Sequence, residues 1–152
     1  GGTLFVAGRG GERFAVRNSG ASAVIEGIGN HGCEYMTRGT VVVLGEIGHN
    51  FGAGMTGGSA FIYTKKLSIK SRLNTEFVKE SNLTSSDENL LKRLLNTHIF
   101  HTGSTIASQI ISDWKKEKYH FKCIVSLAQD IVDFKNIYDL HVADRLGVVL
   151  NE

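Results

Sequence analysis

The stretch that decides the fold is residues 11–63, GERFAVRNSGASAVIEGIGNHGCEYMTRGTVVVLGEIGHNFGAGMTGGSAFIY. Short apolar runs recur here and just upstream, at residues 4–8, 14–16, 23–27, 41–45 and 60–63. Glycines at positions 2, 20, 39 and 58 precede four of these runs, with spacings of 18, 19 and 19 residues. Glycines at 8, 27 and 45 close three of them, with spacings of 19 and 18. A fixed period of this kind is typical of stacked units that cannot bury their apolar faces alone.

The length of this period limits what each unit can contain. Nineteen residues hold two strands of three to five residues and tight turns, but no helix of typical length. Parallel strands without helical crossovers require a coil, with successive turns about 4.8 Å apart. The sequence therefore predicts a mainly β fold, a right-handed single-stranded β-helix of about three coils over residues 1–66. Glycines fit its corners, where the backbone needs positive φ or where neighbouring coils approach closely.

Composition changes after the glycine-rich part. Sixteen of the 18 glycines lie at or before Gly58, whereas all ten lysines follow Tyr63, which places a boundary near residues 63–71. Over residues 67–125 we expect an extended segment at 75–80, two helices and a short strand at 121–125. The first helix begins at a capping box, Ser85 to Glu88, and ends at Gly103, and the second spans 105–118.

The two expected helices either cap the open end of the coil stack, where they would cover unpaired strand groups, or flank the coils. Residues 126–152 are predicted to be a diverged, partly helical tail, with a weaker helix at 131–140.

Overall composition excludes several classes of protein. The 152 residues carry a net charge of +2 and are 41% hydrophobic, which suits one domain with a real core. Near neutrality argues against nucleic acid or an anionic membrane as the main partner, and no apolar run is long enough for a membrane span. Two cysteines cannot form a disulfide scaffold, so a reducing, cytoplasmic setting is expected. Organellar targeting stays open, because the chain begins with Gly1 and is interpreted as a piece of a longer protein.

Two stretches, residues 27–32 and 52–57, match the dinucleotide fingerprint GxGxxG. That fingerprint functions only when a helix begins within it and directs its N-terminus at the pyrophosphate. In both places the next strand follows too soon for a helix or a crossover connection. We therefore interpret these glycines as coil corners and not as a cofactor site.

Residues suited to metal binding or nucleophilic catalysis are few. His31, Cys33 and Glu34 are adjacent, but a zinc site needs three or four converging ligands, which Cys123 could complete only by chance of folding. Cys33 is better explained as a core residue, and Cys33 with His31 lacks a third, orienting group.

The other polar residues of the coils also have structural explanations. Asn30, His49 and Asn50 are expected as solvated turn residues. The four coil carboxylates are not obviously paired, and some of the four coil arginines are candidates for anchoring an interface; these are Glu12, Glu26, Glu34 and Glu46, and Arg9, Arg13, Arg17 and Arg38. The sequence predicts no catalytic, cofactor-binding or metal-binding residue.

The coil segment also resembles a known family. RFAVRNSGA at 13–21, VIEGIG at 24–29, HGCEYMT at 31–37, GTVVVLG at 39–45 and NFGAGMTGG at 50–58 are similar to the C-terminal GXGXG domain of the glutamate synthase large subunit. The resemblance continues more loosely to about residue 125, through Trp114 and FKCIV at 121–125.

This resemblance implies a parent enzyme that converts glutamine, 2-oxoglutarate and a reductant into two molecules of glutamate. Such enzymes combine a glutamine amidotransferase domain with an FMN domain that carries an iron–sulfur cluster, and NAD(P)H or ferredoxin supplies electrons. The implied role of this chain is structural, packing between those domains of the same large subunit, with a small reductase subunit or domain as a further partner. The alternative is a free-standing β-helix that serves as a binding or interaction module. For the isolated chain, the first coil is expected to be incomplete and its exposed strand at residues 4–8 to favour self-association.

Overall fold

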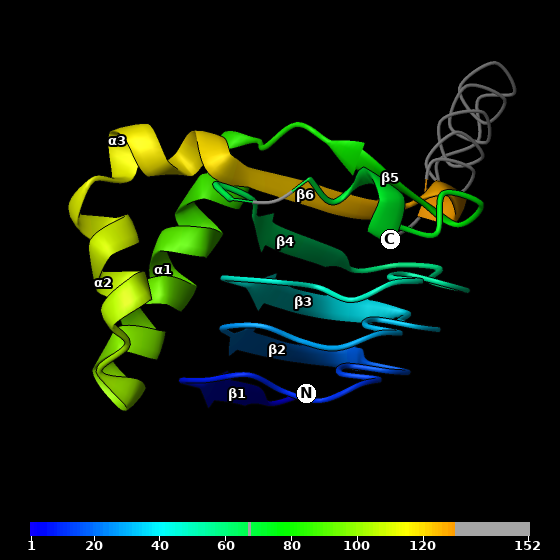
Figure 1. Ribbon diagram of the computed structural model, residues 1–152, viewed down its shortest axis with the longest axis horizontal. Helices are drawn as coiled ribbons and strands as arrows, with labels where there is room; N and C mark the ends of the chain where they lie inside the picture. Colours follow the sequence, from blue (N-terminus) through cyan, green and yellow to red (C-terminus); the bar gives the residue numbers. More distant parts are fainter. Residues whose placement is uncertain (67, 130–152) are drawn as a thin grey trace, which may run out of the picture.

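The computed structural model describes residues 1–66 and 68–129, which include a β-solenoid of about three turns (Figure 1). Each coil contributes one strand to a parallel array of β1 (Thr3–Val6), β2 (Ser19–Ile25), β3 (Arg38–Val43) and β4 (Ser59–Tyr63). Thr3 pairs with Ser22, Ser22 with Thr40 and Thr40 with Ser59, so successive coils are 19, 18 and 19 residues apart. The coil period and the β-helix predicted from the sequence are confirmed.

The other side of each coil is not a strand. Residues 14–16, predicted as an apolar strand, lie in a turn segment in which every second residue has positive φ. The same alternation recurs one period later in each coil, at Arg13, Ala15 and Arg17, at His31, Cys33 and Tyr35, and at Asn50, Gly52 and Gly54. The prediction was wrong here because an apolar run does not reveal the sign of φ.

Backbone hydrogen bonds between coils hold these turn segments together. Cys33 N–H donates to Phe14 O at 2.9 Å, and Tyr35 N–H donates to Ala53 O at 2.9 Å. A left-handed residue other than glycine costs on the order of 1 kcal/mol. The intercoil hydrogen bonds offset this cost, because they give each of these amides a backbone partner in the neighbouring coil.

Apolar side chains cover both faces of the parallel sheet. Val41 and Val43 face the inside of the solenoid, where they pack with Ile25 and Ile62. Val42, between them, faces outward into a second cluster with helical leucines. Because successive strand residues point to opposite faces, burial on both sides explains the continuous run VVVL at 41–44.

The end of the stack above β4 is covered by extended chain and not by helices. β6 (Phe121–Ser126) pairs antiparallel with β4 and with β5 (Val78–Ser81), giving the sheet order β1-β2-β3-β4-β6-β5. The turn side continues through η1 (Lys70–Arg72), where Phe51 N–H donates to Arg72 O at 2.9 Å. The strand at 121–125 is confirmed, whereas the extended segment predicted at 75–80 begins only at Val78. Of the two placements expected for the helices, the cap on this end is taken by β6, and the sequence does not show which element pairs with the last strand.

The helices instead cover the outward face of the sheet (Figure 1). α1 (Ser85–Thr102) contributes Leu91, Leu94 and Leu95 to the second cluster and ends at Gly103, which has φ 66°, as predicted. Its capping box is Thr84 with Asp87, one residue before the predicted pair, because Thr84 adopts the extended N-cap conformation.

The second predicted helix is interrupted. α2 (Thr105–Ser112) ends at Asp113, whose φ of −124° and ψ of 40° are not helical, and α3 (Trp114–Glu117) and η2 (Lys118–His120) follow. This break changes the direction of the chain between Ile110, on α2, and Glu117, at the end of α3. No helix in the described ranges is both long and apolar enough to cross a membrane. The helix predicted at 131–140 lies outside the described residues.

Replacing Gly45 tests whether the close approach of neighbouring coils requires a residue without a side chain at this position. A Cβ added at Gly45 would lie 2.3 Å from Glu26 O, a backbone atom of the preceding coil. We expect Gly45→Ala to lower the free energy of unfolding by about 2–3 kcal/mol, measured by urea denaturation.

Gly11→Ala is the matched control, because a Cβ there has nothing within 4 Å. It should be neutral or stabilising by about 0.5 kcal/mol. Equal effects of the two substitutions would contradict a specific contact between coils.

Candidate functional site

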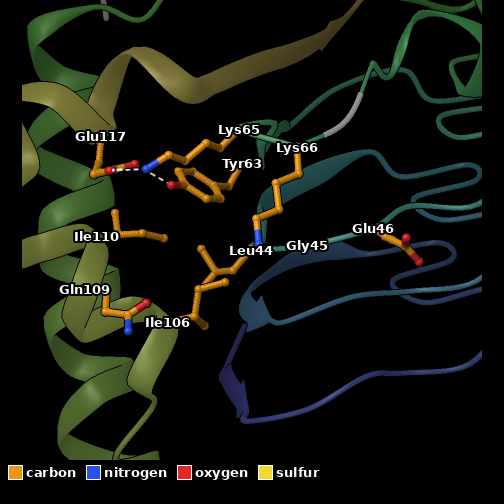
Figure 2. Close-up of a pocket in the computed structure, with 10 residues that line it drawn as sticks. All are labelled: Leu44, Gly45, Glu46, Tyr63, Lys65, Lys66, Ile106, Gln109, Ile110 and Glu117. Carbon is orange, nitrogen blue, oxygen red and sulfur yellow. Dashed lines mark hydrogen bonds and ion pairs between the residues drawn. The ribbon is translucent and has the colours of Figure 1, made fainter.

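A pocket of about 470 Å³ opens where the outward face of the sheet meets α2 and α3 (Figure 2). We call it the sheet–helix pocket. It is lined by Leu44, Gly45, Glu46, Tyr63, Lys65, Lys66, Ile106, Gln109, Ile110 and Glu117. A concave site of this volume with a few polar groups on apolar walls is of the kind that binds small molecules.

The fold brings these residues together from both halves of the chain. Leu44 follows β3 and Tyr63 ends β4, so both lie where their strands leave the sheet. Ile106, Gln109 and Ile110 lie three and four positions apart on α2 and share one face of that helix. The non-helical Asp113 then separates α2 from α3, and Glu117 lies opposite Tyr63.

Glu117 is the centre of the polar wall. Tyr63 donates its hydroxyl hydrogen to Glu117 Oε2, and Lys65 Nζ donates to Glu117 Oε1 at 2.7 Å. The hydrogen bond from Lys65, followed by that from Tyr63, lowers the pKa of the Glu117 carboxyl, so it stays ionised. Burial, followed by the hydrogen bond to Glu117, raises the pKa of Tyr63 above its usual value of 10.0. The phenol therefore remains a hydrogen-bond donor at neutral pH.

The other two charged lining residues differ in direction. In the view of Figure 2 the ammonium of Lys66 is drawn toward Leu44 and Gly45, while the carboxylate of Glu46 points away from the other lining residues. Arg9 Nη1 donates to Glu46 Oε2 at 2.8 Å, and this contact lowers the pKa of Glu46. Arg9, a candidate interface residue, thus forms an exposed ion pair between coils.

A second polar cluster joins the helices to the second coil. Ser104, the N-cap of α2, donates its hydroxyl to Glu26 Oε1 and accepts the Ala107 N–H at 3.2 Å. His98 Nε2 lies 3.5 Å from the same Glu26 oxygen, and the imidazole is completely buried. Neither ring nitrogen of His98 has a hydrogen-bond partner among the described residues.

This cluster contains the residue types of a hydrolase triad in the wrong arrangement. In a hydrolase triad the histidine imidazole contacts the serine hydroxyl and activates it. Here the Ser104 hydroxyl donates its hydrogen bond to the Glu26 carboxylate instead. Ser104 is also only 3% exposed and serves as a helix cap. Sequence analysis missed the pairing of Glu26 with Ser104, and the only local signal was a serine directly after Gly103, at a helix start.

A third group bridges neighbouring coils on the turn side. His31 Nδ1 lies 2.7 Å from Glu34 Oε1, and Asn50 Nδ2 donates to the same oxygen at 3.1 Å. Asn74 Nδ2 then donates to Asn50 Oδ1 at 2.8 Å. Asn30 Oδ1 likewise accepts the His49 N–H at 2.8 Å. Asn30 and Asn50 therefore link coils and are not simply solvated turn residues, because stacking places their amides beside the next layer.

The two cysteines lie in different cores. Cys33 is fully buried inside the solenoid, as predicted, and Cys123 packs between the sheet and the helices. Burial raises the pKa of each thiol to about 12. Cys33 therefore does not act with His31, and residues 1–66 and 68–129 contain no group of three His, Cys, Asp or Glu side chains arranged for a metal ion.

The fingerprint glycines lie at coil corners, as predicted. Neither stretch is followed by a helix: β3 begins at Arg38 after the first, and β4 begins at Ser59 after the second. A Cβ at Gly32 would lie 2.9 Å from the Phe51 ring, and a Cβ at Gly57 would lie 2.4 Å from Thr37 O. These glycines thus allow neighbouring coils to pack closely.

Tyr63→Phe tests the polar wall of the pocket. It leaves Glu117 Oε2 without its donor, and we expect a loss of about 1–2 kcal/mol in the free energy of unfolding, measured by urea denaturation. Tyr119→Phe is the matched control, because Tyr119 is 74% exposed, and it should change stability by less than about 0.5 kcal/mol. Similar values for the two variants would show that the Tyr63–Glu117 contact adds nothing to stability.

His98 predicts a pH dependence of stability. Burial lowers its folded-state pKa below the usual 6.5, although the Glu26 carboxylate opposes this change. Below about pH 6.5 His98 binds a proton more readily in the unfolded chain than in the folded chain. The free energy of unfolding should therefore fall as the pH decreases from about 7 to about 5.5. His98→Leu should flatten this slope in urea midpoints, and His101→Gln, at an exposed position of the same helix, should not. A slope that survives in His98→Leu would assign the effect to another group.

Comparisons with known proteins identify the same family by its sequence model and by individual relatives. The family described as GXGXG motif matches residues 1–127. Over 121 residues the chain is 48% identical to "Glutamate synthase [NADH]" of Schizosaccharomyces pombe, which covers 79% of this chain and 6% of that protein. Over 117 residues it is 50% identical to "Ferredoxin-dependent glutamate synthase 2, chloroplastic" of Arabidopsis thaliana, covering 76% of this chain and 7% of that protein.

A bacterial relative completes the range. The chain is 43% identical over 126 residues to "Glutamate synthase [NADPH] large chain" of Bacillus subtilis, covering 82% of this chain and 8% of that protein. The chain thus spans less than a tenth of the length of these relatives. With its solenoid period and its glycine corners, the chain belongs to the GXGXG family and represents the GXGXG domain of glutamate synthase large subunits.

Proposed function

We propose that this chain is a non-catalytic, structural domain of a glutamate synthase, which packs between the amidotransferase and FMN domains of the large subunit. The observation that carries the proposal is the 43–50% identity to glutamate synthases over less than a tenth of their length. The parent reaction, from glutamine, 2-oxoglutarate and a reductant to glutamate, belongs to the proposal for the whole protein.

The use of polar side chains in the structure supports a structural role. Glu26 connects the second coil to the start of α2, Glu34 connects the second coil to the third, and Glu117 connects α3 to the end of β4. Buried polar groups that are fully used in such contacts rigidify a fold. Rigidity is what a domain needs if it fixes the distance between two reaction centres.

The cofactors implied by the parent family do not fit the residues described here. An iron–sulfur cluster is held by several cysteine thiolates, whereas Cys33 and Cys123 are buried in separate cores. The fingerprint glycines lack the helix that would receive a flavin phosphate. We therefore place FMN and the cluster in other parts of the parent protein, with NADH, NADPH or ferredoxin as electron donor.

Two surfaces are suited to contact with other domains. Arg13, Arg17 and Arg38 are exposed and form no ion pair within the described residues. β1 is the last strand at one end of the sheet, and Leu4 on it is 50% exposed. An open strand edge pairs readily with another chain segment, which in isolation leads to self-association. The thiols suit a reducing compartment, either the cytoplasm or an organelle such as the one named for the chloroplastic relative.

The structural role is tested by assaying the purified 152-residue chain for ammonia release from glutamine and for flavin absorbance. We expect neither to exceed the buffer blank, because residues 1–66 and 68–129 present neither a serine paired with a histidine nor a glycine loop that leads into a helix. Glutamine turnover that survives repeated purification, or flavin that remains bound, would contradict the proposal.

An immunoblot of the source organism separates the proposal from the alternative of a free-standing binding module. An antibody raised against the chain should detect a band far larger than 16.6 kDa. A band at the size of the chain itself would favour the module, and its search for partners would then start at the exposed arginines.

A further inference from the structure

The sheet–helix pocket has more hydrogen-bond donors than acceptors. Both oxygens of Glu117 are occupied, by Tyr63 and by Lys65. Lys65 keeps two N–H groups beyond that contact, and Lys66 keeps three, since no described carboxylate pairs with it. Gln109 adds an amide from the α2 side, with two donor hydrogens on its nitrogen and one acceptor oxygen. A ligand that matches this wall must therefore supply acceptors.

The charge of the lining is also unbalanced. Lys65 and Glu117 neutralise each other at 2.7 Å, and Glu46 is turned outward to Arg9. Lys66 is the remaining charge, so the pocket carries one unpaired positive charge among its described lining residues. A ligand with one negative charge would neutralise the charge of Lys66, whereas a cation would be repelled by it.

The rest of the lining is apolar and comes from two packed layers. Leu44 and Ile110 are buried in the second cluster, and Ile106 packs against that cluster. An inorganic phosphate would leave this floor and most of the 470 Å³ without contact. A molecule that carries both a charged end and an apolar body uses both parts of the site.

We propose that the sheet–helix pocket binds a small organic monocarboxylate with an apolar body. The carboxylate lies between Lys66 and the Gln109 amide, and the apolar body rests on Leu44, Ile106 and Ile110. This site is separate from the structural role proposed above, since it needs neither the neighbouring domains nor the parent reaction.

Hexanoate is the probe for the test, with hexanamide as its neutral counterpart of equal length. Two-dimensional amide NMR spectra of the full chain are recorded during titration with each compound. We expect saturable shifts for hexanoate at α2 and the end of β4, and a dissociation constant roughly fivefold higher for hexanamide, because a charge-assisted hydrogen bond is lost. Equal dissociation constants for the two compounds would overturn the carboxylate site, as would hexanoate shifts that stay linear and scattered over the surface.

Three variants localise the binding. Lys66→Met keeps the length of the side chain and removes its charge, so it should weaken hexanoate binding roughly fivefold and leave hexanamide binding unchanged. Lys92→Met, at an exposed position on α1, is the matched control and should change neither. Gln109→Trp, at an exposed position of α2, should block the pocket and abolish the saturable shifts of both compounds while the remaining spectrum shows the native fold. Equal losses in the two lysine variants, or unchanged binding in Gln109→Trp, would overturn the assignment.

Discussion

The close approach of one coil to the next is the constraint on which this structure depends. Strand ladders on one side and backbone hydrogen bonds between turn segments on the other join each coil to its neighbour, at intervals of 18 or 19 residues. At the corners the backbones come so near that a methyl group would touch main-chain atoms, as at Gly45 and Gly48. The glycine-rich composition therefore reflects packing of backbone against backbone, and not flexibility.

Stacking alone would leave the outward face of the sheet exposed, and the helices correct this. Val24, Val42 and Phe61 project from three successive coils toward α1 and α2, and the leucines of α1 cover them. β6 pairs with β4, the last strand of the parallel array, and β5 pairs in turn with β6 at that edge of the sheet. Because β6 and β5 run antiparallel to their partners, they stop the repeat instead of extending it. The second half of the chain thus depends on the first for its place.

The sequence predicted the features that repeat and missed those that depend on contacts between distant residues. The glycine spacings are local, so they revealed the coils, and Gly103 marked the end of α1. The turn side was misjudged at residues 14–16 because alternating φ leaves no mark in an apolar pattern. The pairing of Glu26 with Ser104 joins positions 78 residues apart, and the residue types alone do not indicate it. The polar wall of the pocket was likewise missed, since Lys65 and Glu117 meet only after Asp113 interrupts the helix.

The position of the pocket follows from the repeat. Within the solenoid, each coil faces a nearly identical coil, so polar side chains such as Asn30 and Asn50 form hydrogen bonds to the neighbouring coil. Where the repeat meets the helices, the two surfaces have no common period, and their side chains cannot all pair with one another. Space and a surplus of donors remain at that junction, between β4 and α2. Among the described residues, we therefore expect ligand binding at the boundary between the repetitive and non-repetitive halves.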